Sequence, residues 1–177
     1  MDYAYKEKEA IVYSNVRENI ELVIYSLIAF FVPFLIAGPQ WFVGIIVNTA
    51  LVLAALRIKD FKVLPVIILP SLAVLTRGLV FGPFTVFLAY LVPFIWAGNA
   101  ILVLLAKRLH KKNLFTLLAA GPLAKASFLF LSAAILVSLG IIPAVFIAAM
   151  GAVQLLTAIA GSGLALAVNK GMASAGK

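Results

Sequence analysis

One uncharged stretch, Phe84 to Ala106, most constrains what this chain can fold into. Its roughly 23 residues would form a helix about 34 Å long, enough to cross the hydrocarbon core of a bilayer. The stretch follows Gly82 and Pro83, and proline suits a first helical turn. It is followed by the basic residues Lys107, Arg108, His110, Lys111 and Lys112. The pattern predicts a transmembrane helix that runs from the outside to the cytoplasm.

The whole chain has the composition of a membrane protein. Its 177 residues are 65% hydrophobic and 11% charged, with a mean hydropathy of +1.19. A soluble globular domain has a charged fraction nearer a quarter. We therefore expect an all-α, polytopic membrane helix bundle.

Hydrophobic runs predict six transmembrane helices, at about 19–37, 41–58, 63–80, 84–106, 114–139 and 143–168. With the N-terminus inside, twelve basic residues fall on the cytoplasmic side: Lys6, Lys8, Arg17, Arg57, Lys59, Lys62, Lys107, Arg108, Lys111, Lys112, Lys170 and Lys177. Arg77 lies near the outside, where it either anchors a helix at the headgroups or attracts an anion. This bias predicts both termini in the cytoplasm and a multi-pass protein of the cell membrane.

The predicted organisation is a cytoplasmic N-terminal segment (1–18), a six-helix transmembrane domain (19–168) and a cytoplasmic tail (169–177). In the first segment, Val12, Val16 and Ile20 recur at helical spacing, which favours a short interfacial helix on the cytoplasmic membrane surface. Asn15 with Glu18 three residues later resembles a cap that would start the first span. Disorder up to Ser14 fits the same residues equally well.

Several functional classes are excluded by composition. The net charge of +8 comes from basic residues in short segments between hydrophobic runs, which orient membrane helices and do not indicate nucleic-acid binding. The chain has no cysteine and one histidine, so disulfides, thiolate metal sites and iron–sulfur clusters are excluded. No nucleophile–base pair is visible. We expect neither an enzyme nor a cofactor.

Lys125 is the most informative polar residue, because it lies about 11 residues into the fifth span. A charge at the centre of a membrane costs at least about 2.5 to 3.5 kcal/mol. No Asp or Glu follows Asp60, and we expect no carboxylate within any span. Lys125 must therefore be neutral, hydrated, bound to carbonyls and amides, or paired with the negative charge of a ligand. We weigh two interpretations against each other. Lys125 binds the negative charge of a ligand, or it donates to carbonyls freed by Pro122 one turn earlier.

Asn48, Asn99 and Gln154 are strong hydrogen-bonding residues in three other spans. Each alone is typical of contacts between helices. Together with Lys125 they form a small set of polar groups in an apolar bundle, which is typical of a small-molecule site. Counted from the outer helix ends, Asn99 and Lys125 are both about 20 Å deep, so contact between them is feasible. Trp96 lies too deep for the aromatic belt and is expected to line the same pocket.

The fifth and sixth spans are rich in small residues, including Gly121, Ala126, Gly151 and Gly161. Small residues let helix backbones approach closely in lipid. We expect these two spans to pack tightly against each other or against a partner subunit.

Five segments carry a resemblance to a known group of proteins: FVGIIVNTALVLAAL (42–56), LPSLAVLTRG (69–78), YLVPFIWAGNAILVL (90–104), LAKASFLFL (123–131) and VQLLTAIAG (153–161). The sequence resembles a family of short six-span prokaryotic membrane proteins. These are similar to the S components, the substrate-binding subunits, of energy-coupling-factor (ECF) vitamin transporters. Some members are labelled iron hydrogenase, a chemistry that the absent cysteines exclude here.

The resemblance implies a six-helix bundle that binds a vitamin or related micronutrient toward its outer side. It also implies docking on a membrane coupling subunit with two cytoplasmic ATPases, and the chain itself has no Walker A motif. S components usually carry an alanine-x-x-x-alanine docking pattern in the first span, whereas this span has Ser26, Ala29 and Ala37. The alternative is a structural subunit that anchors a larger complex through the small residues of spans five and six.

Overall fold

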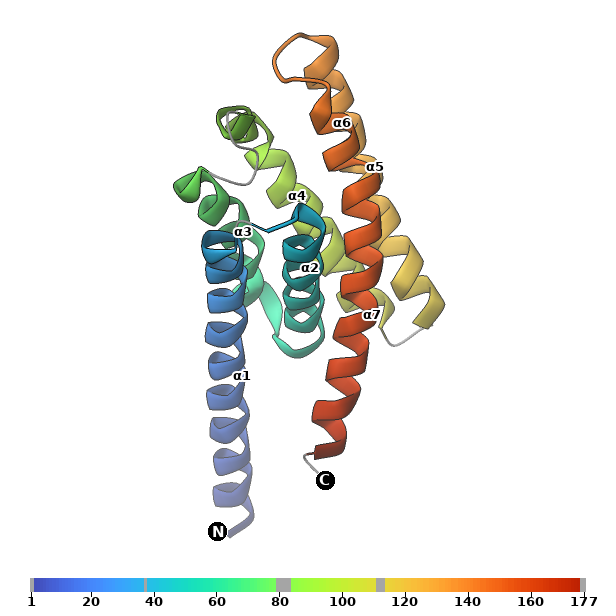
Figure 1. Cartoon of the computed structure of the whole chain (residues 1–177). Coiled ribbons are helices and arrows are strands. Elements are labelled where there is room, and N and C mark those ends of the chain that lie inside the picture. Colours follow the sequence, from blue (N-terminus) through green and yellow to red (C-terminus); the bar gives the residue numbers. More distant parts are fainter. Residues whose placement is uncertain (1, 37, 79–83, 111–113, 176–177) are drawn as a thin grey trace.

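The structure, a computed structural model, describes residues 2–36, 38–78, 84–110 and 114–175, and side chains are described at 12–36, 38–78, 84–110 and 116–174. Described residues form helices and connecting turns, with no strand among them. The elements, in chain order, are α1 (Asp2–Leu35), α2 (Gln40–Arg57), the short 3-10 helix η1 (Asp60–Val63), α3 (Leu64–Arg77), α4 (Thr85–Leu109), α5 (Leu114–Ser138), α6 (Val145–Met150) and α7 (Ala152–Ala175) (Figure 1). The predicted all-α class is confirmed.

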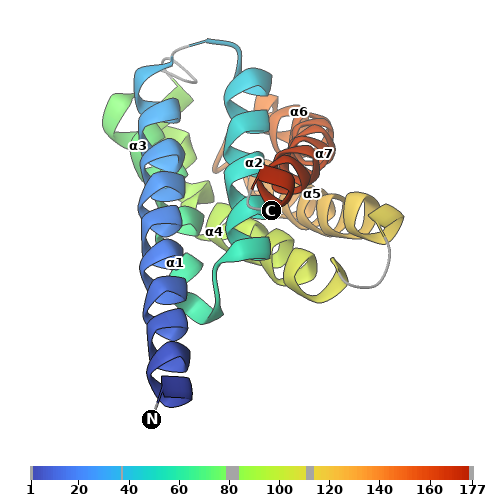
Figure 2. The ribbon, with the colours of Figure 1, turned by 90° about the horizontal axis from the view of Figure 1, so that it is seen from below.

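Successive long segments run up and down the bundle, so that α1 begins and α7 ends at the same end (Figure 1). The central helix is α2, which contacts α1 on one side, α7 on the other and α4 behind. Figure 2 shows α2 between α1 and the α5–α7 group. Since α2 is enclosed in this way, its residues from Val47 to Ala55 are all buried.

Five helical segments are long and apolar enough to cross a membrane: Val12–Leu35, Gln40–Arg57, Thr85–Leu109, Thr116–Ser138 and Val145–Ser174. These correspond to five of the six predicted spans and identify a multi-pass membrane protein. The predicted third span, 63–80, is shorter than expected. Its helix α3 has 14 residues and ends at Gly78, whose left-handed backbone (φ 67°) is typical of a helix terminus. Residues 79 and 80 lie outside the described residues.

The N-terminal segment differs from the prediction. A helix start at Asn15 is wrong, because α1 continues without a break from Asp2 to Leu35, over 34 residues. Residues 2–18 extend the first span along its own axis (Figure 1). The physical reason is that no glycine or proline occurs between Asp2 and Val32, so nothing in that sequence ends the helix.

Two apolar clusters fill the interior. The larger surrounds α2 and includes Ala29, Leu51, Val66 and Leu102. The smaller packs α4 against α5 and α6 through Leu91, Leu129, Phe146 and others. The two clusters pack neighbouring helices together through buried, mostly aliphatic side chains.

The α2 and α7 helices approach each other closely at Gly161. A β-carbon at Gly161 would lie 2.8 Å from the carbonyl oxygen of Ile45 and 2.9 Å from the backbone nitrogen of Thr49. The Thr49 hydroxyl also donates to the Gly161 carbonyl at 3.2 Å. The expected packing between spans five and six is present, since α5 contacts both α6 and α7, whereas Gly161 itself faces α2. Gly121 of α5 faces Leu102 of α4.

Basic residues gather at the end of the bundle where α1 begins and α7 ends. Arg57, Lys59, Lys62, Lys107, Arg108 and Lys170 all lie at or near helix ends on that side. Arg77 lies at the opposite end, where its guanidinium donates to the carbonyl of Phe34 in the last turn of α1. A cation at that position complements the partial negative charge of a helix C-terminus. The contact is a helix cap within the bundle.

Candidate functional site

A cavity of about 100 Å³ lies inside the bundle, and its wall includes residues from α1 through to α7. The polar side chains on its wall are Gln40, Asn48, Ser71, Asn99, Lys125, Gln154 and Thr157. Four of the five predicted site residues are in this set. Gln40 is the first residue of α2 and Asn48 lies about 12 Å farther along it, so the cavity extends inward from the end opposite the termini.

Lys125 and Asn48 are hydrogen-bonded to each other on the cavity wall. The Lys125 ammonium donates to Asn48 Oδ1 at 2.6 Å. Both side chains are almost fully buried, with 2% and 1% exposure. The hydrogen bond crosses from α5 to α2 and so does not go to a carbonyl freed by Pro122. Asn99, which helical depth made a feasible partner, is not among the described hydrogen-bond partners of Lys125.

The orientation of the Asn48 amide is determined by its other bonds. Its Nδ2 donates to the Gly44 carbonyl at 2.9 Å and to Thr157 Oγ1 at 3.2 Å. The Thr157 hydroxyl donates in turn to the Gln154 carbonyl at 3.2 Å. Because both amide hydrogens have acceptors, the amide oxygen is left facing Lys125.

Close helix packing brings these groups together. A β-carbon at Gly44 would lie 3.0 Å from Thr157 Cγ2, and one at Gly161 would lie 2.7 Å from Asn48 Cβ. Glycine at both positions lets α2 and α7 approach until Asn48 and Thr157 are within hydrogen-bonding distance. A larger residue at either position would separate the two side chains.

Asn99 and Trp96 both bond to α3. Asn99 Nδ2 donates to the Ile67 carbonyl at 3.0 Å, and Asn99 is 2% exposed. Trp96 does not line the cavity, although it was expected to. Its indole nitrogen donates to Ser71 Oγ at 2.6 Å, and Ser71 is on the cavity wall. Trp96 therefore supports the wall from behind.

The break between α6 and α7 lies beside the cavity. Gly151 stands at the break, and Met150, Val153 and Gln154 around it line the wall. A β-carbon at Gly151 would lie 2.9 Å from both the Ile147 carbonyl oxygen and Phe130 Cδ2. Interrupted helices at membrane depth are found where they line a cavity. The interruption places the first turn of α7 at the site.

The cavity wall has one basic side chain and no acidic one among the described residues. Lys125 is its only charged side chain among the described residues, and none of the described carboxylates lies on its wall. Lys125 forms no ion pair within the described structure. This imbalance is unusual in the interior of a membrane protein, where buried charges are normally paired.

Three residues of the site were not predicted from the sequence: Thr157, Ser71 and Gln40. Thr157 lies three residues after Gln154, so the two share a helix face, and this spacing was the available signal. Ser71 follows Pro70 in the middle of α3. Serine and threonine in membrane helices commonly bond to their own backbone, so neither stands out as a ligand-binding residue.

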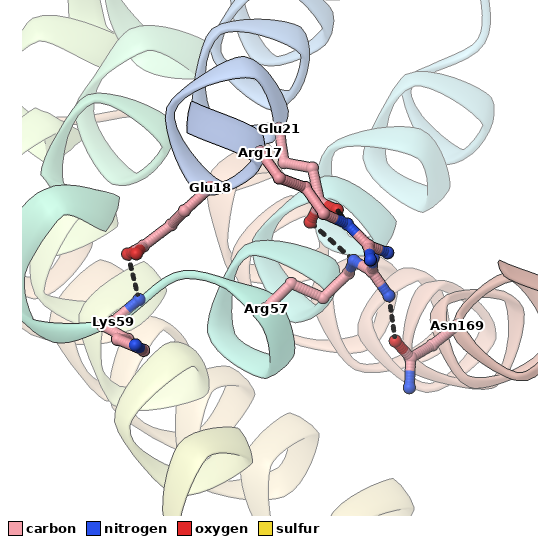
Figure 3. Close-up of polar contacts among 6 residues, drawn as sticks. All are labelled: Arg17, Glu18, Glu21, Arg57, Lys59 and Asn169. Carbon is pink, nitrogen blue, oxygen red and sulfur yellow. Dashed lines mark hydrogen bonds and ion pairs between the residues drawn. The ribbon is translucent and has the colours of Figure 1, made fainter. Parts of the chain in front are cut away.

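A second polar cluster lies where the end of α2 meets the middle of α1, and Figure 3 shows its residues. Arg57 donates to Glu21 through Nε and Nη2, both at 2.6 Å, and through Nη1 to Asn169 Oδ1 at 3.1 Å. Arg17 also donates to Glu21, at 3.1 Å. The expectation that no carboxylate lies within a span is wrong at Glu21, which is 8% exposed. The cluster joins α1, α2 and α7.

Glu18 lies in the same cluster and has a different role from the predicted cap. Its Oε1 accepts a hydrogen bond from the backbone N–H of Lys59 at 2.7 Å (Figure 3). Lys59 precedes η1, so Glu18 fixes the turn between α2 and α3. Its carboxylate stabilises a distant turn instead of the start of its own helix.

Comparisons with known proteins give no relative for this chain: no family model, no curated protein and no solved structure matches it. The described residues also contain no group of three or more His, Cys, Asp or Glu placed to hold a metal ion. The resemblance to S components stays a prediction, and the chain's function has to be argued from its cavity.

Proposed function

We propose that this chain is the membrane-embedded substrate-binding subunit of a small-molecule importer of the ECF type. The observation that carries the proposal is one cavity on whose wall Asn48, Asn99, Lys125 and Gln154 meet. These residues come from α2, α4, α5 and α7 and are far apart in the sequence. Convergence of a few polar groups on an otherwise apolar wall is typical of a small-molecule site.

The position of the cavity supports capture from one side of the membrane. It extends inward from the helix ends opposite the basic residues, from Gln40 toward Asn48 and Lys125. Basic residues favour the cytoplasmic side, so the cavity faces the outside in the predicted orientation. A substrate-binding subunit of an importer requires this placement.

The size of the cavity restricts the substrate. About 100 Å³ is less than the roughly 300 to 1,000 Å³ typical of drug-sized ligands. A small solute fits this volume, whereas a whole vitamin requires the bundle to open. Movement of α6 at the Gly151 break is the structural change that we propose for such an opening.

Energy for import has to come from partners, because the sequence contains no nucleotide-binding motif. The surface that would dock on a coupling subunit differs from the usual S-component pattern. Ala29 is fully buried inside the bundle, and so it is not part of any docking face. We propose that docking uses the exposed face of α1 that includes Ile20, Val23 and Leu27.

Copurification from native membranes tests this function. A tagged chain, solubilised in a mild detergent, is expected to retain a membrane coupling subunit and two ATPases, identified by mass spectrometry. A triple variant, Ile20→Ser, Val23→Ser and Leu27→Ser, should lose these partners while keeping its own elution volume. Recovery of redox or other catalytic subunits in their place would support the alternative, a structural subunit, and contradict the importer.

A further inference from the structure

We infer that the cavity takes a small carboxylate ligand, whose charge is balanced by Lys125. The inference deepens the proposed function by naming the substrate class. It rests on that function only for the biological role, since binding of a carboxylate is measured on the isolated protein.

The first step concerns the charge of Lys125. The ammonium has three N–H donors, and the described structure gives one hydrogen bond, to the neutral amide oxygen of Asn48. The Lys125 side chain is 2% exposed and borders the cavity. The cavity is therefore the space available to its other two N–H donors. A buried amine either gives up its proton or needs a counter-charge or extensive hydrogen bonding. An anion in the cavity provides both.

The second step concerns the groups around Lys125. The Asn48 amide cannot rotate to offer its N–H groups to a ligand, because Gly44 and Thr157 accept them. An approaching anion therefore meets the ammonium as its charged partner. Val153 and Gln154 in the first turn of α7 also border the cavity, and the positive end of a helix dipole favours negative charge.

The third step concerns the rest of the ligand. The wall is largely aliphatic, with Val43, Val47, Val74, Leu88 and Ile95 facing the cavity. An alkyl group suits this wall, whereas a hydrated inorganic anion leaves it without apolar contacts. A phosphate dianion would bring a second negative charge with no described cation to balance it. A monovalent carboxylate on a short alkyl chain fits the charge, the wall and the volume of about 100 Å³.

The test measures ligand-induced thermal stabilisation of the purified full-length chain in detergent. The probes are sodium acetate, propionate and butyrate, each paired with its neutral amide, with sodium chloride and phosphate at equal ionic strength. A ligand that binds only the folded state raises the melting temperature, by an amount that grows with the logarithm of its concentration relative to its Kd. We expect saturable shifts with at least one carboxylate and none with its amide.

Two variants assign the effect to the site. Lys125→Met should weaken carboxylate binding at least tenfold, and the matched control Lys170→Met, an exposed lysine on α7, should leave it unchanged. Asn48→Asp places a carboxylate beside Lys125 and should abolish the shift although the lysine is still present. This second variant keeps the test decisive if Lys125→Met fails to fold.

Equal shifts with carboxylates and amides, or an undiminished shift in the Asn48→Asp variant, would overturn the inference and make Lys125 a structural residue. Absence of a shift with every carboxylate tested would overturn it as well. The result of this thermal-shift test is independent of the result of the copurification experiment. A carboxylate-binding protein without ATPase partners would keep the inference and reject the importer.

Discussion

Gly161 lies against Asn48 so closely that a β-carbon at position 161 would stand 2.7 Å from the β-carbon of Asn48. The contact sets the distance between α2 and α7 at the level of the cavity. Asn48 in turn supplies the acceptor for Lys125 at 2.6 Å. The packing of two helices and the geometry of the proposed site are therefore determined by the same pair of residues.

Gly161→Ala should destabilise the protein, because the added methyl group overlaps Asn48 and the backbone of α2. Overpacking of this kind costs about 1 to 3 kcal/mol. Gly163→Ala is the matched control, since nothing lies within 4 Å of a β-carbon there. The control should be neutral or slightly stabilising, because alanine favours a helix over glycine. Melting temperatures of the two variants in detergent check the prediction. Equal values for Gly161→Ala and Gly163→Ala would contradict the close contact.

The sequence predicted the spans well, because long uncharged runs are a direct consequence of the thickness of a bilayer. It predicted their ends less well. At α1, the charges from Lys6 to Glu18 suggested a separate segment, whereas the absence of glycine and proline lets one helix continue. At α3, Gly78 ends the helix earlier than its hydropathy suggests.

Four of the five predicted site residues line the cavity, whereas their contacts with one another were not predicted. Depth counted along each helix placed Asn99 level with Lys125 and Asn48 about 10 Å shallower. The structure pairs Lys125 with Asn48 instead. Residue counting ignores helix tilt and the length of the lysine side chain, and both are set by packing between helices.

Glu21→Gln should destabilise the bundle by about 3 kcal/mol, because it leaves the Arg57 guanidinium without its carboxylate. The two side chains are only 10% and 13% exposed, so water replaces the lost partner poorly. Lys62→Gln is the control. Lys62 is 43% exposed and 3.8 Å from Glu18, and a pair of this kind contributes less than about 1 kcal/mol. Thermal unfolding of both variants checks the prediction, and a similar loss in each would contradict it.

Trp96→Phe should lower the melting temperature while leaving ligand binding intact, because Trp96 bonds Ser71 without lining the cavity. Loss of one hydrogen bond costs about 1 kcal/mol. Ser71→Ala removes the same hydrogen bond from the cavity side and leaves the indole N–H of Trp96 unpaired. It should therefore destabilise the protein more than the loss of the hydrogen bond alone. A carboxylate affinity reduced tenfold or more in Trp96→Phe would place Trp96 in the site itself.

Cysteine labelling tests the orientation, and the native chain has no cysteine to interfere. Ser138→Cys, at the end of α5, should react with a membrane-impermeant maleimide on intact cells. Ser174→Cys, near the end of α7, should react only after lysis. Both serines are exposed and lie at opposite ends of the bundle. The reverse pattern would place the cavity mouth on the cytoplasmic side.

The shortness of α3 also affects the surrounding lipid. Its 14 residues span about 21 Å, against about 30 Å for the hydrocarbon core. Leu64 and Leu72 are exposed on α3, so this short helix meets acyl chains directly. The α4 and α5 helices, with 25 residues each, are long enough for the full thickness. We therefore expect a one-sided hydrophobic mismatch, with the bilayer thinner beside α3 than beside α4 and α5.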